Sequence, residues 1–252
     1  MMNRVEFTRL PTLDYACEEA INTLCTNLTF SGVNKRKILM TSCQASEGKS
    51  FLTINIMRTL ARLGHSVALV DADLRRSQIA ARYGMRVVEG SGQGMTHYLA
   101  GMCSLGEVLY QTNLPGTCII PVGHEVSNSL ALLSTSRLPH MLDQLREKFE
   151  FVLVDAPPVG VIIDAAEIAK FCDGAILGVK YNAISRKELV EAKNQLERSG
   201  CEILGAVLNS VAFDTLSSKK YYNKHYYSHY ESDYYKPSQK GKKQSRTKKY
   251  GK

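Results

Sequence analysis

The chain has 252 residues, of which 44% are hydrophobic and 22% charged. This composition is typical of a globular protein with one α/β domain and a short appendage. The formal net charge of +8 is uneven, because residues 217–252 carry +9 and residues 1–216 sum to −1. The seven cysteines form no C-x-x-C pair, which argues against a disulfide framework or a zinc site and fits a reducing cytoplasm. No apolar run reaches the ~18 residues that cross a bilayer.

Apolar runs alternate with helical patterns along most of the chain. Six runs are typical of strands, at 37–42, 66–71, 118–122, 151–155, 174–180 and 203–209. Five stretches are typical of helices, at about 15–29, 49–63, 135–147, 161–170 and 184–199. The strand runs are continuous rather than alternating, as expected of strands that are buried on both faces. We therefore expect an α/β fold with a doubly wound, mostly parallel sheet, and short helices and loops over 84–117.

Residues 217–252 differ from the rest of the chain. They contain no Leu, Ile, Val, Phe or Met, so they cannot build a core, and disorder is the expected state. Eight of the thirteen tyrosines lie here: Tyr221, Tyr222, Tyr226, Tyr227, Tyr230, Tyr234, Tyr235 and Tyr250. We therefore predict a folded domain over 1–216 and a disordered Tyr/Lys-rich tail over 217–252.

A phosphate-binding signature follows the first predicted strand. The segment 42–50 ends in Gly48-Lys49-Ser50 at the start of a predicted helix, as a P-loop does. Gly48 lets the backbone approach a phosphate, Lys49 can reach the β and γ oxygens, and Ser50 can ligate Mg²⁺. The helix N-terminus adds unpaired N–H groups and a positive dipole end. Cys43 replaces the usual first glycine of the loop, so this motif alone is a weak signal.

Two predicted strands end in aspartates. Asp71 and Asp73 lie in the sequence VDADLRR, and Asp155 lies in VDAPP. A carboxylate at the end of a buried strand costs desolvation energy unless it meets a cation or donors. Parallel strands bring their carboxyl ends to one edge of the sheet, so we expect these carboxylates to converge on Mg²⁺ beside the phosphate loop. The alternative is that Asp71 or Asp155 only caps the following turn.

These motifs together resemble the bacterial tyrosine kinases of capsule and exopolysaccharide assembly. The resemblance covers roughly residues 15–235 and is carried by EGKS, LVDADLR, VLVDAPPV, GAVLN and the tyrosine cluster. The DADLR and DAPP motifs combined with the tail are specific, whereas GKS is not. The resemblance implies a stand-alone cytoplasmic kinase of P-loop NTPase type that uses ATP and Mg²⁺ to phosphorylate protein tyrosines.

The resemblance also implies a role for each site residue. Asp71 would act as base or orienter for the incoming phenol and as a metal ligand, with Asp73 assisting near the metal. Ser50 would ligate Mg²⁺, Asp155 would hold it through water, and Lys49 would act on the transferring phosphate. The nucleotide would be bound by Ser46, Glu47, Gly48, Lys49, Ser50, Phe51 and Asn209, the last against adenine. These roles agree with phosphoryl transfer, which requires mainly positioning, charge neutralisation and a proton acceptor.

Two departures from the family pattern matter. Relatives carry PGEGKS where this chain has ASEGKS, and Ser46 has less backbone freedom than glycine, so weaker nucleotide binding is expected. Relatives also carry an E-x-x-R-x-x-R-T-N motif that contacts the next subunit of a ring-shaped homo-oligomer. In this chain the motif starts at Glu19, and Asn22 and Cys25 replace the two arginines. Neither side chain mimics a guanidinium fork, so the ring contact is expected to be weakened.

The tail separates the functions that this scaffold can serve. Its tyrosines beside a kinase-like domain predict phosphoacceptors at Tyr221, Tyr222, Tyr226, Tyr227, Tyr230, Tyr234 and Tyr235. The alternatives for a Lys/Tyr-rich tail are a nucleic-acid arm and a polybasic membrane-surface segment; we expect no nucleic acid. The alternative for the domain is a partition- or septum-type ATPase, but those ATPases place a lysine where this chain has Gln44.

The resemblance finally implies partners and a location. We expect the kinase to phosphorylate its own tail, mainly between neighbouring molecules, and to regulate the polymerisation or export of a capsular or extracellular polysaccharide. A membrane-anchored activator, the polysaccharide co-polymerase, is expected to recruit this cytoplasmic protein to the inner face of the cell membrane.

Overall fold

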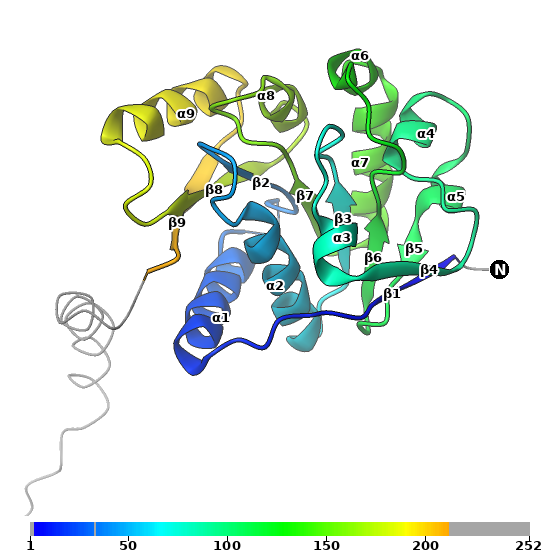
Figure 1. Ribbon diagram of the computed structural model, residues 1–252, viewed down its shortest axis with the longest axis horizontal. Coiled ribbons are helices and arrows are strands. Elements are labelled where there is room, and N and C mark those ends of the chain that lie inside the picture. Colours follow the sequence, from blue (N-terminus) through cyan, green and yellow to red (C-terminus); the bar gives the residue numbers. More distant parts are fainter. Residues whose placement is uncertain (1–2, 33, 212–252) are drawn as a thin grey trace, which may run out of the picture. The chain divides into compact units, whose positions relative to one another are not determined.

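The computed structural model describes residues 3–32 and 34–211, and helices alternate with strands along them (Figure 1). The strands are β1 (Arg4–Phe7), β2 (Lys37–Ser42), β3 (Val67–Asp71), β4 (Met85–Glu89), β5 (Tyr110–Gln111), β6 (Thr117–Ile120), β7 (Phe151–Asp155), β8 (Gly174–Lys180) and β9 (Ile203–Asn209). The helices are α1 (Tyr15–Phe30), α2 (Lys49–Arg62), α3 (Ile79–Tyr83), α4 (Met95–Leu99), α5 (Leu105–Val108), α6 (Ser129–Leu133), α7 (Arg137–Lys148), α8 (Asp164–Ala169) and α9 (Arg186–Arg198). The predicted domain boundary at residue 216 and the tyrosine-rich tail lie outside the described residues and stay predictions.

The strands of the described part form one sheet in the order β4-β1-β5-β6-β3-β7-β2-β8-β9. Every neighbouring pair from β6 through β9 in this order is parallel. These six strands are the six that the apolar runs predicted, so the mostly parallel, doubly wound sheet is confirmed. The carboxyl ends of β2, β3 and β7 consequently lie at one edge of the sheet, where the phosphate loop and the predicted aspartates follow.

The other end of the sheet was not predicted. β4 pairs antiparallel with β1, and β5 pairs antiparallel with β6. The prediction of only short helices and loops over 84–117 is right for α4 and α5 and wrong for β4 and β5. These strands gave no signal because β5 has two residues and β4 is mostly exposed at the sheet edge, so neither needs a continuous apolar run.

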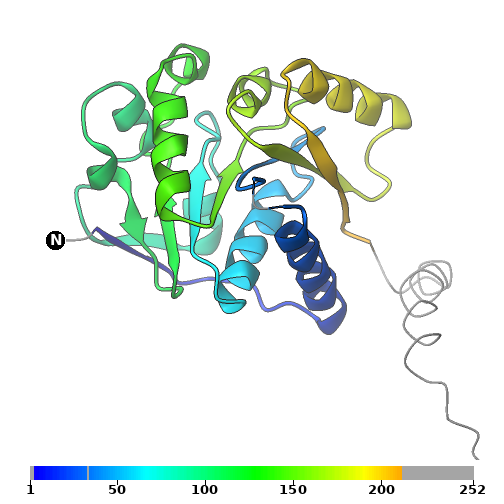
Figure 2. The ribbon, with the colours of Figure 1, turned by 180° about the vertical axis from the view of Figure 1, so that it is seen from behind.

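Helices cover both faces of the sheet. Alternate residues of β2 show the two cores, because Ile38 and Met40 pack with α1 and α2, whereas Leu39 packs with the helices of the opposite face. In Figure 1, β2, β8 and β9 lie between α1 and α2 below and α8 and α9 above, and Figure 2 shows α7 on the rear face of the sheet. None of the helices in residues 3–32 and 34–211 is long and apolar enough to cross a membrane.

Candidate active site

The loop between β2 and α2 has the backbone of a phosphate-binding loop. Gly48 caps α2 with a φ of 90°, in the left-handed region that favours glycine. A Cβ atom at Gly48 would lie 2.0 Å from Asn209 Nδ2, so Asn209 approaches only because residue 48 has no side chain. Asn209 Nδ2 donates a hydrogen bond to Glu47 O at 2.9 Å. The structure thus brings the predicted Gly48 and Asn209 together.

Ser46 and Glu47 shape the same loop. Ser46 has a φ of 63°, a conformation that costs a non-glycine residue roughly 1–2 kcal/mol. The carboxylate of Glu47 is buried and accepts hydrogen bonds from Gln44 N at 2.6 Å and Lys180 N at 3.3 Å. The side chain of Glu47 therefore stabilises the loop, which leaves its main chain for the predicted nucleotide contact.

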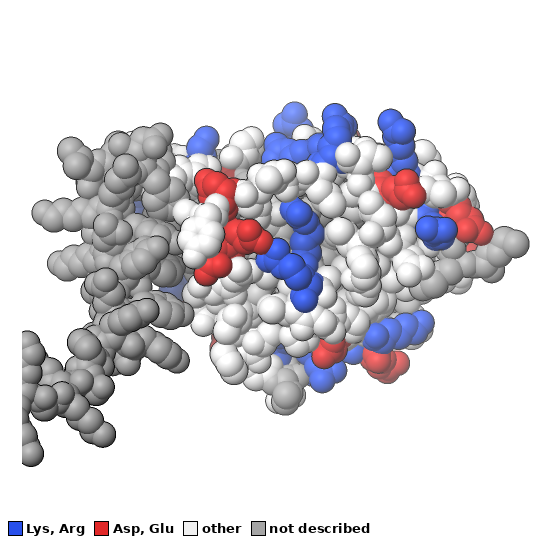
Figure 3. Space-filling view, turned by 90° about the horizontal axis from the view of Figure 1, so that it is seen from below, with Lys and Arg blue, Asp and Glu red and all other residues white. Residues whose placement is uncertain are grey.

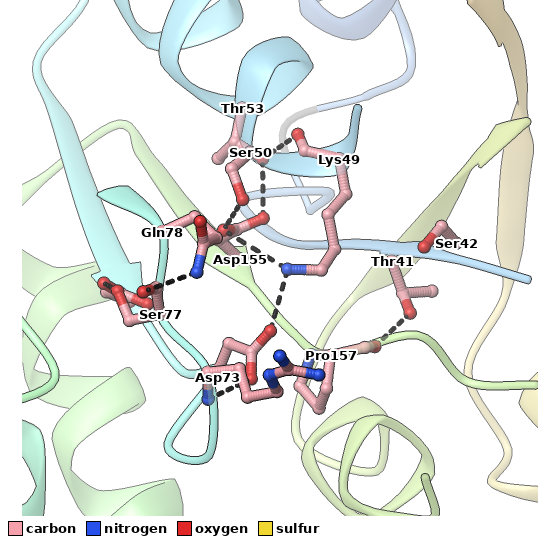
Figure 4. A network of polar contacts seen from close by, with 12 residues as sticks. Thr41, Ser42, Lys49, Ser50, Thr53, Asp73, Ser77, Gln78, Asp155 and Pro157 are labelled. Carbon is pink, nitrogen blue, oxygen red and sulfur yellow. Dashed lines mark hydrogen bonds and ion pairs between the residues drawn. The ribbon is translucent and has the colours of Figure 1, made fainter. Parts of the chain in front are cut away.

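Lys49 and Ser50 contact the strand-end carboxylates (Figure 4). Lys49 Nζ lies 2.9 Å from Asp73 Oδ2 and 3.9 Å from Asp155 Oδ2. Ser50 Oγ donates a hydrogen bond to Asp155 Oδ2 at 2.6 Å. Three segments that carried separate sequence motifs, the phosphate loop and the ends of β3 and β7, therefore meet at one site.

Asp155 is held by two hydroxyl groups of α2. Besides Ser50, Thr53 Oγ1 donates a hydrogen bond to Asp155 Oδ1 at 3.1 Å, and the carboxylate is buried. The sequence analysis did not predict Thr53. It follows Ser50 by three residues, a spacing that places both side chains on one face of a helix, so this spacing was the signal that could have found it. The two bonds show that Asp155 does more than cap its own turn.

Asp71 lies next to Asp155 on the neighbouring strand, and the two residues are in register. Asp71 Oδ2 accepts a hydrogen bond from Ser77 Oγ, in the turn after β3. Asp71 Oδ1 is buried and has no hydrogen-bond partner within the described part of the chain. An unsatisfied buried acceptor costs about 1–3 kcal/mol, so this oxygen favours a ligand that donates a proton or carries positive charge. Ser77 gave no recognisable signal in the sequence.

Burial dominates the electrostatics of the site. Burial and, after it, the neighbouring carboxylate of Asp155 raise the pKa of Asp71 to about 8, although the Ser77 hydrogen bond and Lys49 oppose the rise. Burial also raises the pKa of Asp155, although Lys49 and the Ser50 hydrogen bond oppose the rise. For Lys49, burial lowers the pKa, but Asp155 and Asp73 outweigh burial and the net shift is upward. Lys49 is therefore charged at neutral pH, and the two aspartates would gain from a further cation.

The residues fit a magnesium ion that is shared with a nucleotide. Ser50, Asp71 and Asp155 offer hard oxygen ligands beside the phosphate loop, including the unpartnered Asp71 Oδ1. In the described ranges, no group of three or more His, Cys, Asp or Glu side chains could hold a metal ion by itself. Mg²⁺ keeps several waters and takes phosphate oxygens together with one or two carboxylates, so the oxygens of Ser50, Asp71 and Asp155 suit it.

The helix that was expected to contact a neighbouring subunit uses its substituted residues inside the chain. Asn22 Oδ1 accepts a hydrogen bond from Arg62 Nη2 at 2.9 Å. Cys25 is fully buried, and its Sγ lies 3.8 Å from Ile56 O. Burial raises the pKa of the Cys25 thiol to about 12. Cys25 is therefore not available to a neighbour, and the weakened ring contact stays a prediction.

Comparisons with known proteins give the family. Residues 35–199 match the model of the AAA domain. The chain is 35% identical over 195 residues to the tyrosine-protein kinase CpsD of Streptococcus agalactiae serotype Ia, which covers 77% of this chain and 83% of the relative. It is 34% identical over 221 residues to CpsD of Streptococcus pneumoniae serotype 4, which covers 84% and 95%. The chain belongs to the bacterial tyrosine-kinase family.

Solved structures place this kinase-family chain on a known fold. The kinase domain of the Escherichia coli tyrosine kinase ETK superimposes with a TM-score of 0.73 at 26% identity and covers 79% of this chain and 77% of that one. The septum site-determining protein MinD of Pyrococcus horikoshii superimposes with a TM-score of 0.59 at 25% identity and covers 69% of each. Because the scaffold is shared with septum-type ATPases, the sequence relatives rather than the fold identify the kinase family.

Proposed function

We propose that this chain is an ATP- and Mg²⁺-dependent protein-tyrosine kinase that phosphorylates the tyrosine tails of neighbouring copies. We further propose that this reaction regulates the polymerisation or export of a capsular or extracellular polysaccharide. The observation that carries the proposal is the contact of Lys49 with both Asp73 and Asp155, at the end of a helix whose Ser50 also binds Asp155. Membership of the tyrosine-kinase family favours a phenol over water as the acceptor.

The reaction uses few groups of the protein. The phenol oxygen of a tyrosine attacks the γ-phosphorus of ATP, the bond to the β–γ bridging oxygen breaks, and ADP leaves with that electron pair. Lys49 neutralises charge on the transferring phosphoryl group, which is the main requirement of this chemistry. Asp71 accepts the phenol proton on one carboxylate oxygen, which leaves its other oxygen for a contact with Mg²⁺. Mg²⁺ bound by Ser50, Asp71 and Asp155 would neutralise further charge on the phosphates.

The contacts of the phosphate loop support one orientation of the nucleotide in the proposed site. The base of a bound nucleotide would lie towards Asn209, because this side chain reaches the phosphate loop from the end of β9. Asp71 lies on the other side of Asp155, since β3 and β2 are both neighbours of β7. The acceptor tyrosine therefore enters from the side of β3, opposite the base. The nucleotide and the acceptor tyrosine would then lie beside different strands at the same edge of the sheet.

The tail gives the reaction a physical consequence. Residues 217–252 carry +9 and hold seven proposed phosphoacceptors, from Tyr221 to Tyr235. Each phosphate adds about −1.5 to −2 charges, so about five phosphates convert a basic segment into a neutral or acidic one. We propose that this change alters the association of the kinase with a membrane-anchored activator. The activator would recruit the kinase to the inner face of the membrane.

The test incubates the purified protein with ATP and Mg²⁺, with and without the cytoplasmic segment of its activator, and maps phosphotyrosine by mass spectrometry. We expect phosphate on several of the seven tail tyrosines, and faster labelling with the activator. Release of phosphate into solution without any protein labelling would contradict the proposal. It would support the septum-type ATPase instead, the alternative that shares this scaffold.

A further inference from the structure

Positive charge is distributed unevenly over the folded part of the chain. The segment Leu74–Val88 contains four arginines and no acidic residue. One of them, Arg75, donates a hydrogen bond through Nε to the buried Asp164 at 3.0 Å. Arg82, at the C-terminal end of α3, is exposed and has no carboxylate partner in the part of the chain that the structure describes. Its guanidinium group is therefore accessible to an anionic ligand.

Arg9 brings a second guanidinium group to the same end of α3. Its backbone N–H donates to Tyr83 O at 3.0 Å, and its Nη2 donates to Ala81 O at 2.5 Å. Gly84 has a φ of 59°, and a Cβ atom there would lie 2.9 Å from Arg9 Nε. Arg9 approaches only because residue 84 is a glycine. Two exposed arginines from distant parts of the sequence are thus fixed at one end of a short helix.

Arg58 of α2 adds a third guanidinium group, which contacts the chain two residues after Arg9. Its Nη1 donates to Pro11 O at 2.9 Å and to Asn55 Oδ1 at 3.0 Å, and both acceptors are neutral. Within residues 3–32 and 34–211, no carboxylate forms an ion pair with Arg9, Arg58 or Arg82. Arg9 and Arg58 are both tied to the segment between β1 and α1, and Arg9 also contacts α3 next to Arg82. An anionic ligand would pair with these guanidinium groups.

A recess of about 570 Å³ opens beside Arg58. We call it the linker recess because residues 10–13, which link β1 to α1, form part of its wall. Its wall combines apolar and polar side chains, and the residues used below are Leu10, Leu13 and Arg58. Arg62 and Glu18 also line it, but they pair with each other at 2.5 Å. Figure 3 shows the molecule from below, with several Lys and Arg side chains along the upper edge of the view. A recess of this volume is within the range of sites that bind small ligands.

We propose that the linker recess binds a phosphotyrosine side chain from the phosphorylated tail of a second copy of this chain. The ring packs against Leu10 and Leu13, and Arg58 holds the phosphate with its unused N–H groups. Arg9 and Arg82 bind a neighbouring phosphate of the same tail. Arginine is suited to this role because its planar fork matches phosphate oxygens. The proposal rests on the proposed kinase function, which produces the phosphotyrosine.

Charge complementarity selects the phosphorylated tail as the occupant. The unmodified tail carries +9, so the three arginines repel it. Each added phosphate contributes about −1.5 to −2 charges, and the repulsion turns into attraction after about five additions. The site therefore distinguishes product from substrate by the sign of the charge.

The linker recess is separate from the phosphoryl-transfer site. Arg58 follows Lys49 by nine residues on α2, which corresponds to about 13 Å along the helix axis. A phosphorylated tail that is bound at the linker recess therefore leaves the phosphoryl-transfer site free for the next tyrosine. This separation explains why the arginines lie on α2, on α3 and on the segment between β1 and α1, away from the phosphate loop.

The test measures binding of a fluorescent peptide that spans residues 218–236 and carries phosphotyrosine at positions 221, 222, 226 and 227. The protein is the full-length Lys49→Met variant, whose tail stays unmodified, with Mg²⁺ and a non-hydrolysable ATP analogue. We expect Arg58→Gln and Arg9→Glu each to weaken binding by about tenfold or more, since a charge-assisted hydrogen bond contributes about 1.5–3 kcal/mol. The unphosphorylated peptide should bind at least about tenfold more weakly than the phosphopeptide.

Arg198→Glu, at the exposed end of α9, is the matched control and should leave the affinity unchanged. Unchanged phosphopeptide affinity in both Arg58→Gln and Arg9→Glu overturns the proposal, as does equal binding of the unphosphorylated peptide. Phosphatidylserine vesicles serve as a third probe, and the proposal also fails if Arg58→Gln abolishes vesicle binding but not peptide binding. Arg9 is exposed, so Arg9→Glu remains decisive if Arg58→Gln does not fold. The peptide is synthetic, so failure here leaves the ATP-labelling test of the kinase function standing.

Discussion

Asp71 and Asp155 stand in register on the adjacent strands β3 and β7, and each residue is only 1% exposed to solvent. Two buried carboxyl groups in register on adjacent strands oppose each other's ionisation. Their hydrogen-bond partners differ, because Asp155 has Ser50 and Thr53 while Asp71 has only Ser77. Burial raises the pKa of both carboxyl groups, that of Asp71 to about 8. Because of this difference in hydrogen-bond partners, Asp155 is fixed beside Lys49, whereas Asp71 can exchange a proton or contact a metal ion.

The raised pKa of Asp71 predicts how stability depends on pH. Folding raises this pKa from 3.8 to about 8, so its stabilising effect is complete below pH 3.8 and is lost as the pH rises through about 8. In Mg²⁺-free buffer, the urea midpoint should fall between pH 5 and pH 8, and the fall should be smaller in Asp71→Asn. Mg²⁺ with an ATP analogue should restore stability at pH 8. The exposed Glu147 of α7 gives the control Glu147→Gln, and equal slopes in Asp71→Asn and wild type would contradict the assignment.

The same residue predicts an effect on transfer that exceeds the effect on binding. Asp71→Asn keeps the shape of the side chain but removes the proton acceptor. Because general-base catalysis contributes about 10²–10⁴-fold, the rate of tail phosphorylation should fall by at least about 100-fold. The dissociation constant for ATP should change far less. Single-turnover labelling and equilibrium nucleotide binding separate the two quantities, and equal losses in both would show that Asp71 only holds the metal.

Lys49→Met should abolish labelling while the fold stays intact. The variant removes the ammonium group that pairs with Asp73 and Asp155, and the loss of one such stabilising donor costs about 10²–10³-fold in rate. The control is Lys187→Met, because this lysine on α9 is largely exposed. Circular dichroism checks the fold. Tail phosphorylation of Lys49→Met at the wild-type rate would remove the phosphate loop from the mechanism.

The sequence predicted the parts of this structure that depend on long apolar runs and on strand ends. β2, β3 and β7 are continuous buried runs. The phosphate loop after β2 and the aspartates at the ends of β3 and β7 could be placed at one edge because parallel strands share their direction. Thr53 was missed although its spacing of three residues from Ser50 was a usable signal, whereas Ser77 was missed because its position depends on the turn after β3. β1, β4 and β5 were missed because their pairing is set by partners far away in the sequence, such as Arg4 with Gln111.

Ser46 and Gly48 predict opposite effects on nucleotide affinity. Ser46 has a φ of 63°, so Ser46→Gly removes strain of roughly 1 kcal/mol and should tighten ATP binding by up to about fivefold if the strain opposes the bound loop. Gly48→Ala adds strain at a φ of 90° and places a Cβ atom 2.0 Å from Asn209 Nδ2, so affinity should fall sharply. Gly200→Ala is the control, because Gly200 also has a positive φ but no atom within 4 Å of a Cβ.

Isothermal titration calorimetry with an ATP analogue measures both changes, and thermal unfolding shows whether they are local. Gly200→Ala should lower stability without changing nucleotide affinity. An affinity that does not change in Ser46→Gly would show that the strain at Ser46 does not oppose nucleotide binding. An unchanged affinity in Gly48→Ala would contradict the close approach of Asn209.

The last prediction concerns direction, namely that a neighbouring molecule phosphorylates most of the tail tyrosines. The chain leaves β9 at Asn209, whose side chain is bonded to the phosphate loop. Residues 210–220 extend to at most about 35–40 Å, so reach alone permits transfer within one molecule. However, Tyr221 would have to turn back past Asn209 and the base to enter from the side of β3. A tail from a second copy has no such constraint.

Mixing separates the two routes. One protein is Lys49→Met with an intact tail, and the other is catalytically intact but ends before residue 217. Label on the intact tail of the first protein demonstrates transfer between molecules, and each protein alone is the control. The wild-type rate per molecule should also rise with protein concentration, because the substituted Asn22 and buried Cys25 offer no arginine fork to hold copies together. A first-order rate that is independent of dilution, with no label in the mixture, would assign the reaction to single molecules.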